Sequence, residues 1–405
     1  MTDRTSVGSM DGARSGDRLG TLLILGGLSA FGPLSLDMYL PALPSLARSL
    51  HTSPAPVQVT LTGCLVGLAL GQLFIGPVSD AYGRRRPLLI GLAVYALTSA
   101  ACAVSPSVWL LAVLRIVQGL AGGAGVVISR AVVRDRHSGT AVARYFSLLM
   151  VVNGLAPILA PVVGGQLLRF TTWRGVFVVL AGIGLVLWLA VLLALPESLP
   201  VARRHSGGLP ATLVTFRRLL TDRSFVGCVV ACGFAFAAMF AYISGSSFVL
   251  QDIYGVSPQL FSVIFGTNAV GIMLLSQVSR VLLGRYGPRR LLVCGLVSIA
   301  VGGVALLVVV MAGIGLPGIL PALFVVVASN GLVLPNATAL ALTDHGAVAG
   351  SASALLGVAQ FAVGAAAAPL VGIGGSGTDI PMAVVIAALS LIALASSALV
   401  LRRSD

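Results

Sequence analysis

Twelve long apolar runs dominate this chain of 405 residues and limit what it can fold into. Most of the runs reach or exceed the roughly 20 residues that a helix needs to cross the hydrocarbon core of a bilayer. They are also too long for the alternating strands of a membrane barrel. We therefore predict an all-α membrane protein with twelve transmembrane helices, at residues 19–47, 56–81, 87–105, 108–130, 142–168, 173–195, 224–249, 257–284, 288–313, 316–342, 347–374 and 380–401.

The composition supports a membrane protein and explains the large positive charge. Hydrophobic residues make up 57% of the chain and charged residues 9%, with a formal net charge of +13. In a soluble protein this charge would suggest a nucleic-acid partner, but cytoplasmic loops of membrane proteins accumulate arginine. With a cytoplasmic N-terminus, 19 arginines fall on the cytoplasmic side and three on the outer side. We expect both termini in the cytoplasm, a multi-pass protein of the bacterial cytoplasmic membrane, and no nucleic-acid partner.

Two landmarks recur at one spacing and indicate an internal duplication. Tyr82-Gly83 and Tyr286-Gly287 are 204 residues apart, and Ser53-Pro54 and Ser257-Pro258 share that offset. Parallel six-helix repeats around a cavity are the design of major facilitator transporters. The predicted units are an N-terminal tail (1–18), a six-helix bundle (19–195), a cytoplasmic linker (196–223), a second six-helix bundle (224–401) and a C-terminal tail (402–405).

A dense charge cluster, "GPVSDAYGRRRPLL", separates the second and third apolar runs. Gly76 and Gly83 permit close helix packing and a tight turn there. Asp80 can accept hydrogen bonds from Arg84, Arg85 or the backbone, which predicts a latch that breaks when the cytoplasmic side opens. The alternative is that the arginines only fix the orientation in the membrane. The second copy has Gly284 in place of Asp80, so only the first half carries the full latch.

Several motifs in order resemble one transporter family. "GQLFIGPVSDAYGRRRP" resembles the loop signature of the major facilitator superfamily, and "LRIVQGLAGGAG" resembles its fourth-helix motif. "LDMYLPALP", "APILAPVVGG", "NGLVLPNATALAL" and "AGSASALLGVAQF" are similar to the bicyclomycin and chloramphenicol resistance (Bcr/CflA) group of drug:proton antiporters. The resemblance spans about residues 20–400 and implies proton-driven drug efflux through alternating access.

Asp37 is the only one of the twelve acidic residues that we place inside a spanning segment. A carboxylate near a helix centre costs about 2.5–3.5 kcal/mol on insertion scales, so it is a functional candidate. The alternative is a carboxylate that caps the proline-broken end of the first helix. Helix rise places Arg115 in the same outer half of the bilayer. Because a buried arginine stays charged, we predict that Arg115 pairs with Asp37 and that Asp37 carries the proton.

The fifth apolar run combines small residues with prolines in the pattern of the antiporter motif. Pro157, Pro161, Gly164 and Gly165 leave a face with little side-chain bulk. We predict that this face packs closely against the other half and limits proton leakage, although simple helix packing is an equal interpretation.

Two sets of residues are candidates for binding a substrate. Phe236, Phe240 and Tyr242 form an aromatic stretch that suits flat or chlorinated organic molecules, with membrane-core packing as the alternative. Polar groups that could hydrogen-bond a neutral ligand, or one another, are Tyr39, Gln118, Asn153, Asn330 and Asn336.

Three function classes remain open on the sequence alone. A drug:proton exporter is favoured by Asp37, Arg115 and the fifth run. An uptake symporter or uniporter for a small metabolite would share the fold, but would place dedicated polar residues in both halves. A membrane enzyme needs a nucleophile–base pair or a metal cluster at membrane depth, and no second intramembrane acid or histidine is present. We expect no cofactor or metal, and a monomer in the lipid bilayer that binds protons and a small hydrophobic drug.

Overall fold

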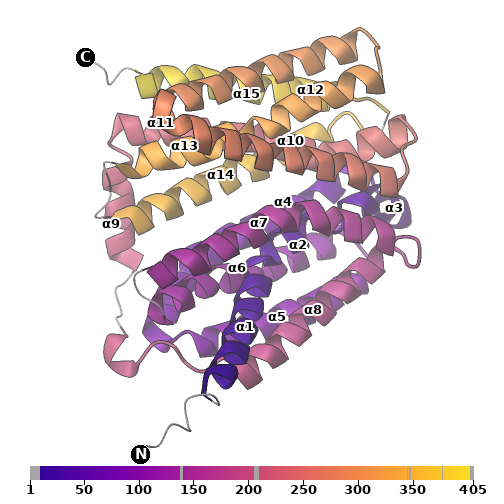
Figure 1. Ribbon diagram of the computed structural model, residues 1–405. Helices are drawn as coiled ribbons and strands as arrows, with labels where there is room; N and C mark the ends of the chain where they lie inside the picture. The colour runs from indigo at the N-terminus through magenta and orange to yellow at the C-terminus, as the bar shows by residue number, and fades with distance from the viewer. Residues whose placement is uncertain are drawn as a thin grey trace, which may run out of the picture.

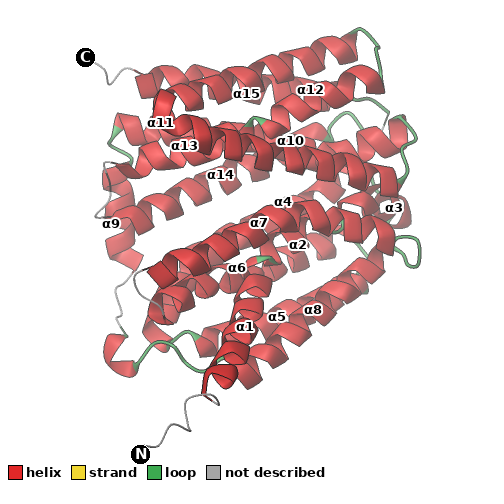
Figure 2. Ribbon diagram, in the orientation of Figure 1, coloured by secondary structure: helices red, strands yellow, loops and turns green. Residues whose placement is uncertain are grey.

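Helices account for nearly all of the chain that the structure describes. The computed structural model describes residues 10–136, 140–204, 209–343, 345, 348–375 and 377–401. Figure 2 shows helices joined by short loops, with no strand in these ranges. The all-α architecture predicted from the apolar runs is confirmed.

The N-terminal bundle begins with a helix broken into short pieces. Its elements are α1 (Met10–Ser29), α2 (Phe31–Asp37), the 3-10 turn η1 (Leu40–Ala42), α3 (Leu43–Ser49), α4 (Pro54–Tyr82), α5 (Arg85–Ala103), α6 (Val108–Arg136), α7 (Thr140–Leu167) and α8 (Trp173–Ala194). The prediction of one continuous helix at residues 19–47 is therefore wrong. Pro41 has no N–H to donate back to Asp37, so the α-helical hydrogen bonding stops there.

The C-terminal bundle follows a linker that contains its own helix. The linker holds η2 (Val201–Arg203) and α9 (Leu209–Leu219), which the sequence did not predict. The bundle comprises α10 (Arg223–Phe248), the π-helical turn η3 (Val249–Ile253), α11 (Pro258–Met311), α12 (Leu316–Ala328), α13 (Asn330–Thr343), α14 (Ala349–Val371) and α15 (Ile380–Leu401). In Figure 1 the two bundles lie one above the other, with α9 spanning the side where both chain ends lie.

The described helices give the predicted number of membrane spans. Ten are long and apolar enough to cross a membrane, and the bent pair Gly20–Ser29 and Phe31–Ser49 makes an eleventh. The 54-residue α11 is interrupted at Gly287, whose φ of 71° and ψ of 163° are not helical. Counted separately, the segments on its two sides complete the twelve.

The duplication is visible in how the helices cross. In the N-terminal bundle Gly67 of α4 lies directly against the backbone oxygen of Ile116 on α6. In the C-terminal bundle Gly331 of α13 lies in the same way against the backbone oxygen of Ile272 on α11. Any side chain at either glycine would force these helices apart, so each bundle has one tight crossing that depends on glycine.

Candidate functional site

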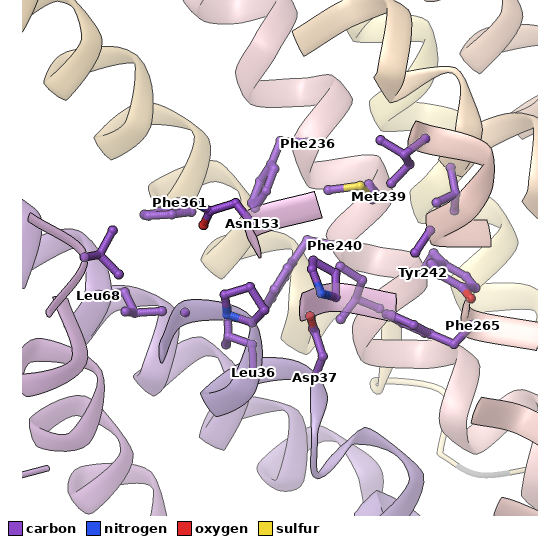
Figure 3. A pocket seen from close by; sticks show the side chains of 18 of the residues that line it. Leu36, Asp37, Leu68, Asn153, Phe236, Met239, Phe240, Tyr242, Phe265 and Phe361 are labelled. Carbon is purple, nitrogen blue, oxygen red and sulfur yellow. The ribbon is translucent and has the colours of Figure 1, made fainter. Parts of the chain in front are cut away.

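A cavity of about 290 Å³ lies between the two bundles. Its lining is mostly apolar, and side chains from both halves contribute to it. The C-terminal half supplies Phe236, Met239 and Phe240 from α10, Phe265 from α11 and Phe361 from α14 (Figure 3). A flexible methionine among aromatic rings adapts to ligands of different shape, as promiscuous sites require.

Asp37 is the only acidic residue among the described residues that line this cavity. It is the last residue of α2 and only 7% exposed. Figure 3 shows its side chain directed from the N-terminal half toward the aromatic side chains of α10. No hydrogen bond or ion pair joins its carboxyl group to another described residue, so the group faces the cavity without a protein partner.

The turn after Asp37 is supported by the fifth predicted helix. Gly164 of α7 lies directly against the backbone oxygen of Met38, in the same bundle. Gly165 instead lies against the Pro258 oxygen and the Ser262 side chain of the other bundle. Close packing of α7 on the other half thus holds at Gly165, whereas Gly164 fixes the backbone beside Asp37. Pro157 lines the cavity, and Pro161 is buried within α7.

The predicted ion pair between Asp37 and Arg115 is absent from the described contacts, and that prediction is wrong for this structure. Arg115 is fully buried and donates from Nη1 to Gln118 Oε1 at 2.6 Å and from Nη2 to the Ser35 backbone oxygen at 2.6 Å. Its guanidinium also lies 4.4 Å from the ring centre of Tyr39. Neutral oxygens and an aromatic face thus contact the cation that we expected to need a carboxylate, while its buried Nε has no hydrogen-bond partner among the described residues.

The aromatic substrate candidates line the cavity, and most of the polar candidates do not. Phe236, Phe240, Tyr242 and Asn153 lie in the lining. Asn153 Nδ2 donates to Ser29 Oγ at 2.6 Å, at the side of the cavity where α1 ends.

The other four polar candidates are buried within the bundles. Tyr39 hydrogen-bonds the Thr60 hydroxyl at 2.8 Å, and Gln118 joins Arg115 to Ser99. Asn336 donates to Ser279 Oγ at 2.7 Å and to the Leu332 oxygen, while Asn330 donates to the Val326 oxygen. These contacts correspond to the interpretation that the polar groups bond one another and the backbone.

Four polar lining residues, Ser29 among them, were missed from the sequence. Asn268 of α11 donates to the Tyr242 hydroxyl at 2.8 Å, and Gln72 of α4 and Arg130 of α6 also face the cavity. Each is a polar residue within an otherwise apolar run, one helical turn from another lining residue, so the helical repeat offered a signal.

The charge cluster after α4 centres on Arg84. This side chain bonds Asp80 Oδ1 at 2.5 Å, Asp135 Oδ2 at 2.9 Å and Ser79 Oγ at 2.7 Å. The contact expected between Asp80 and the arginines is present. Asp135, near the end of α6, completes the cluster.

Glu197 of the linker holds the turn that follows. Its carboxylate accepts the backbone N–H of Arg84 at 2.8 Å and of Arg85 at 3.2 Å, and also those of Ser198 and Leu199. Burial alone would raise the pKa of Glu197, but these four hydrogen bonds outweigh it and hold the pKa below its usual value. Gly83 at φ 89° lies against the same carboxylate.

The cluster does not join the two halves of the protein. Among the described residues, every partner of Arg84 and every hydrogen bond of Glu197 belongs to the N-terminal bundle or to the start of the linker. That this cluster acts as a latch which breaks when the cavity opens toward this side stays a prediction.

Hydrogen bonds between the halves gather on the opposite side, away from the chain ends. Ser247 Oγ donates to the Leu40 oxygen at 2.6 Å, Gln259 Nε2 to the Gly165 oxygen at 2.9 Å, and Arg48 pairs with Asp252 at 2.8 Å. Among the described residues, no side-chain hydrogen bond or ion pair joins the bundles near the chain ends. The contacts hold the cavity closed on the side remote from the termini (Figure 1).

Two helical bundles around a central cavity define a multi-pass membrane transporter. The family profile of the Major Facilitator Superfamily matches residues 24–369, and the chain belongs to this superfamily.

Curated bacterial proteins and solved structures place the chain among transporters. It is 42% identical over 332 residues to the uncharacterized transporter YdgK of Bacillus subtilis, covering 80% of this chain and 82% of that protein. It is 33% identical to a bicyclomycin resistance protein homolog of Haemophilus influenzae (79% and 81% covered), and 29% identical to the multidrug resistance protein MdtL of Escherichia fergusonii (71% and 72% covered). The nucleoside transporter NupG shares the fold, with a TM-score of 0.77, 14% identity and coverage of 94% and 98%.

Proposed function

We propose that this protein exports hydrophobic drugs, such as chloramphenicol- or bicyclomycin-like compounds, in exchange for protons. The observation that carries the proposal is Asp37, the single acidic residue of the cavity lining, placed where the two halves meet. A membrane carboxylate without a protein partner is expensive to retain unless it functions. The bicyclomycin resistance homolog and the multidrug resistance relatives support a drug as the substrate.

In the proposed cycle, Asp37 is either protonated, with no drug in the cavity, or ionised, with a drug bound beside it. With both termini in the cytoplasm of a bacterial cell, the described contacts close the outer side and leave the cavity facing inward. Drug binding beside Asp37 favours loss of its proton to the cytoplasm. The outward-facing state then exchanges drug for a new proton. One carboxylate carries one proton for each cycle.

The membrane potential supplies the driving force. Each proton that moves inward releases about 2.3 kcal/mol per 100 mV of membrane potential. This free energy corresponds to a drug gradient of about 50-fold at 100 mV, since about 1.4 kcal/mol is a factor of ten.

Arg115 acts in this proposal as a positioning residue. Through the Ser35 oxygen it holds α2, whose last residue is Asp37, against α6. The aromatic wall of Phe236 and Phe240 binds the flat part of the drug, while Asn153 and Tyr242 offer hydrogen-bonding groups at the two ends of the lining.

The gating proposal concerns two regions: the turn between α4 and α5, and helix α7 near the outer side. Gly76, Asp80, Gly83, Arg84 and Arg85 stiffen the turn between α4 and α5, so that the N-terminal bundle moves as one body. On α7, Gly165 forms the sliding contact with the other bundle near the outer side. Gly164 holds the turn after Asp37 in the same bundle, and Pro157 and Pro161 lie within α7 beside these contacts.

Transport into inverted membrane vesicles tests this function. We expect a proton-gradient-dependent uptake of drug that an uncoupler abolishes. Asp37→Asn should lower this uptake at least about 100-fold, because the amide keeps the size of the carboxyl group but cannot carry the proton. Asp379→Asn, in the loop between α14 and α15, is the matched control and should retain uptake. Uptake at the full rate after uncoupling would contradict the proposal.

A further inference from the structure

Arg130 is the only basic residue among the described residues that line the cavity. It is solvent-accessible and lies on α6, six residues before the helix ends at Arg136. Because α6 ends on the side of the chain termini, Arg130 lies toward the open side of the cavity, whereas Asp37 lies deeper. The lining thus holds one cation and one acid, both contributed by the N-terminal half.

The guanidinium of Arg130 has no hydrogen-bond or ion-pair partner among the described residues. Two other buried arginines of the N-terminal bundle behave differently, since Arg84 bonds two aspartates and Arg115 bonds two neutral oxygens. A guanidinium offers five N–H donors in a plane that matches carboxylate and sulfonate oxygens. Those donors at Arg130 remain available to a ligand in the cavity.

The charge of the lining sets which ligands it favours. With Asp37 protonated the two ionisable residues carry a net charge of +1, and with Asp37 ionised they carry none. In neither state does the lining present net negative charge to a lipophilic cation. An anion gains attraction from Arg130 as it enters from the open side.

We propose that Arg130 selects hydrophobic substrates that carry an anionic group, with the apolar body on the aromatic wall and the anion on the guanidinium. This inference rests on the proposed transport function and names its substrate class. The same chemistry assists export, because an inside-negative potential drives an anion outward while the exchanged proton moves inward.

A matched pair of dyes tests the proposal. 8-Anilino-1-naphthalenesulfonate and N-phenyl-1-naphthylamine share one aromatic body and differ by a sulfonate. Equilibrium binding is measured by fluorescence with the full-length protein in nanodiscs of zwitterionic lipid, after subtraction of empty nanodiscs. Tetraphenylphosphonium is added as the cationic competitor.

The wild-type protein should bind the sulfonate more tightly than the neutral dye. Arg130→Gln should weaken sulfonate binding about tenfold, the size of one charge-assisted hydrogen bond, and leave the neutral dye unchanged. Arg130→Lys should retain part of the preference. Arg280→Gln, at an exposed arginine of α11 outside the lining, is the matched control and should bind both dyes like the wild type.

Unchanged neutral-dye binding shows that the Arg130→Gln cavity is folded, so a loss confined to the sulfonate supports the proposal. Equal sulfonate binding by the wild type and Arg130→Gln would overturn it, as would tighter binding of tetraphenylphosphonium than of the sulfonate. Proton coupling is measured separately with the uncoupler in vesicles. If uptake in vesicles does not depend on the proton gradient, the proposed transport mechanism is wrong. The preference of Arg130 for anions is then still decided by the dye-binding measurements.

Discussion

The turns at Gly83 and Gly287 lie 204 residues apart and have nearly the same backbone but different surroundings. Gly83 has φ 89° and ψ 167°, and Gly287 has φ 71° and ψ 163°. Both conformations are essentially restricted to glycine. Around Gly83 lie Glu197 and Arg204, whereas a side-chain carbon at Gly287 would meet open space. The two halves thus share the backbone conformation of this turn, but only the N-terminal half has the charge cluster around it.

The cavity lining shows the same difference between the two halves. The N-terminal half supplies Asp37 and Arg130, and the C-terminal half supplies the aromatic wall. Position 284, which matches Asp80, is glycine, and position 288, which matches Arg84, is proline. The two halves therefore differ in the chemistry of the side chains that they contribute to the cavity: the ionised groups come from one half and the aromatic rings from the other.

The largest stability effect should come from the buried cation of the N-terminal half. Arg115→Ala leaves Gln118 Oε1 and the Ser35 oxygen without their donor, and should cost about 2–5 kcal/mol. Val327→Ala, three residues before Asn330 as Arg115 is three residues before Gln118, removes only two methyl groups and should cost about 1–2 kcal/mol. Fluorescence-detected size-exclusion chromatography after heating measures both. Equal losses would show that the two halves do not differ here.

A smaller effect should separate the two turns. Alanine at either glycine is strained by about 1–3 kcal/mol, since a side chain is disfavoured in this backbone region. At Gly83 the new carbon would also lie 2.5 Å from Glu197 Oε2. Gly83→Ala should therefore lower the melting temperature more than Gly287→Ala. In a background that carries both Glu197→Ala and Arg204→Ala the two substitutions should become alike, and a persistent difference would contradict this account.

The smallest effect should be a pH dependence confined to the N-terminal turn. Because the pKa of Glu197 is lower in the folded protein, its carboxylate stabilises the fold at every pH above its unfolded value of about 4.3. That contribution is lost as the pH falls through the folded-state pKa. Glu197→Gln should lower stability by about 1 kcal/mol or less at pH 7, given the partial exposure of this residue.

Melting curves of the wild type and Glu197→Gln between pH 3 and pH 8 measure this contribution. The two proteins should converge at the acid end of the series. Curves that separate further as the pH falls would have the wrong sign for a carboxylate stabilised in its charged form.

The number of spans, the duplication and the aromatic wall could be predicted because they depend on local composition. Long apolar runs dictate helices in lipid, and Phe236 and Phe240 are one helical turn apart, with Tyr242 close by in the same run. Asp37 could be singled out because charge is rare in such runs.

The partners of individual charges could not be predicted. Arg115 donates to a backbone oxygen of α2, and a backbone group carries no signal in the sequence. Glu197 bonds a turn more than 100 residues earlier, so its role depends on how the linker folds back. The break at residues 38–42 had a visible cause in Pro41, but the prolines of α7 do not interrupt that helix. Tertiary packing decides between these outcomes.

Proton release on drug binding is the most direct test of the coupling assigned to Asp37. Drug is added to detergent-solubilised protein in weakly buffered solution, and the pH is followed with an indicator dye. The wild type should release about one proton per bound drug, because a bound drug and the proton on Asp37 exclude each other. Asp37→Asn should bind the drug and release none. Release from the Asp37→Asn protein equal to that of the wild type would contradict the account, because the described cavity lining holds no other acid.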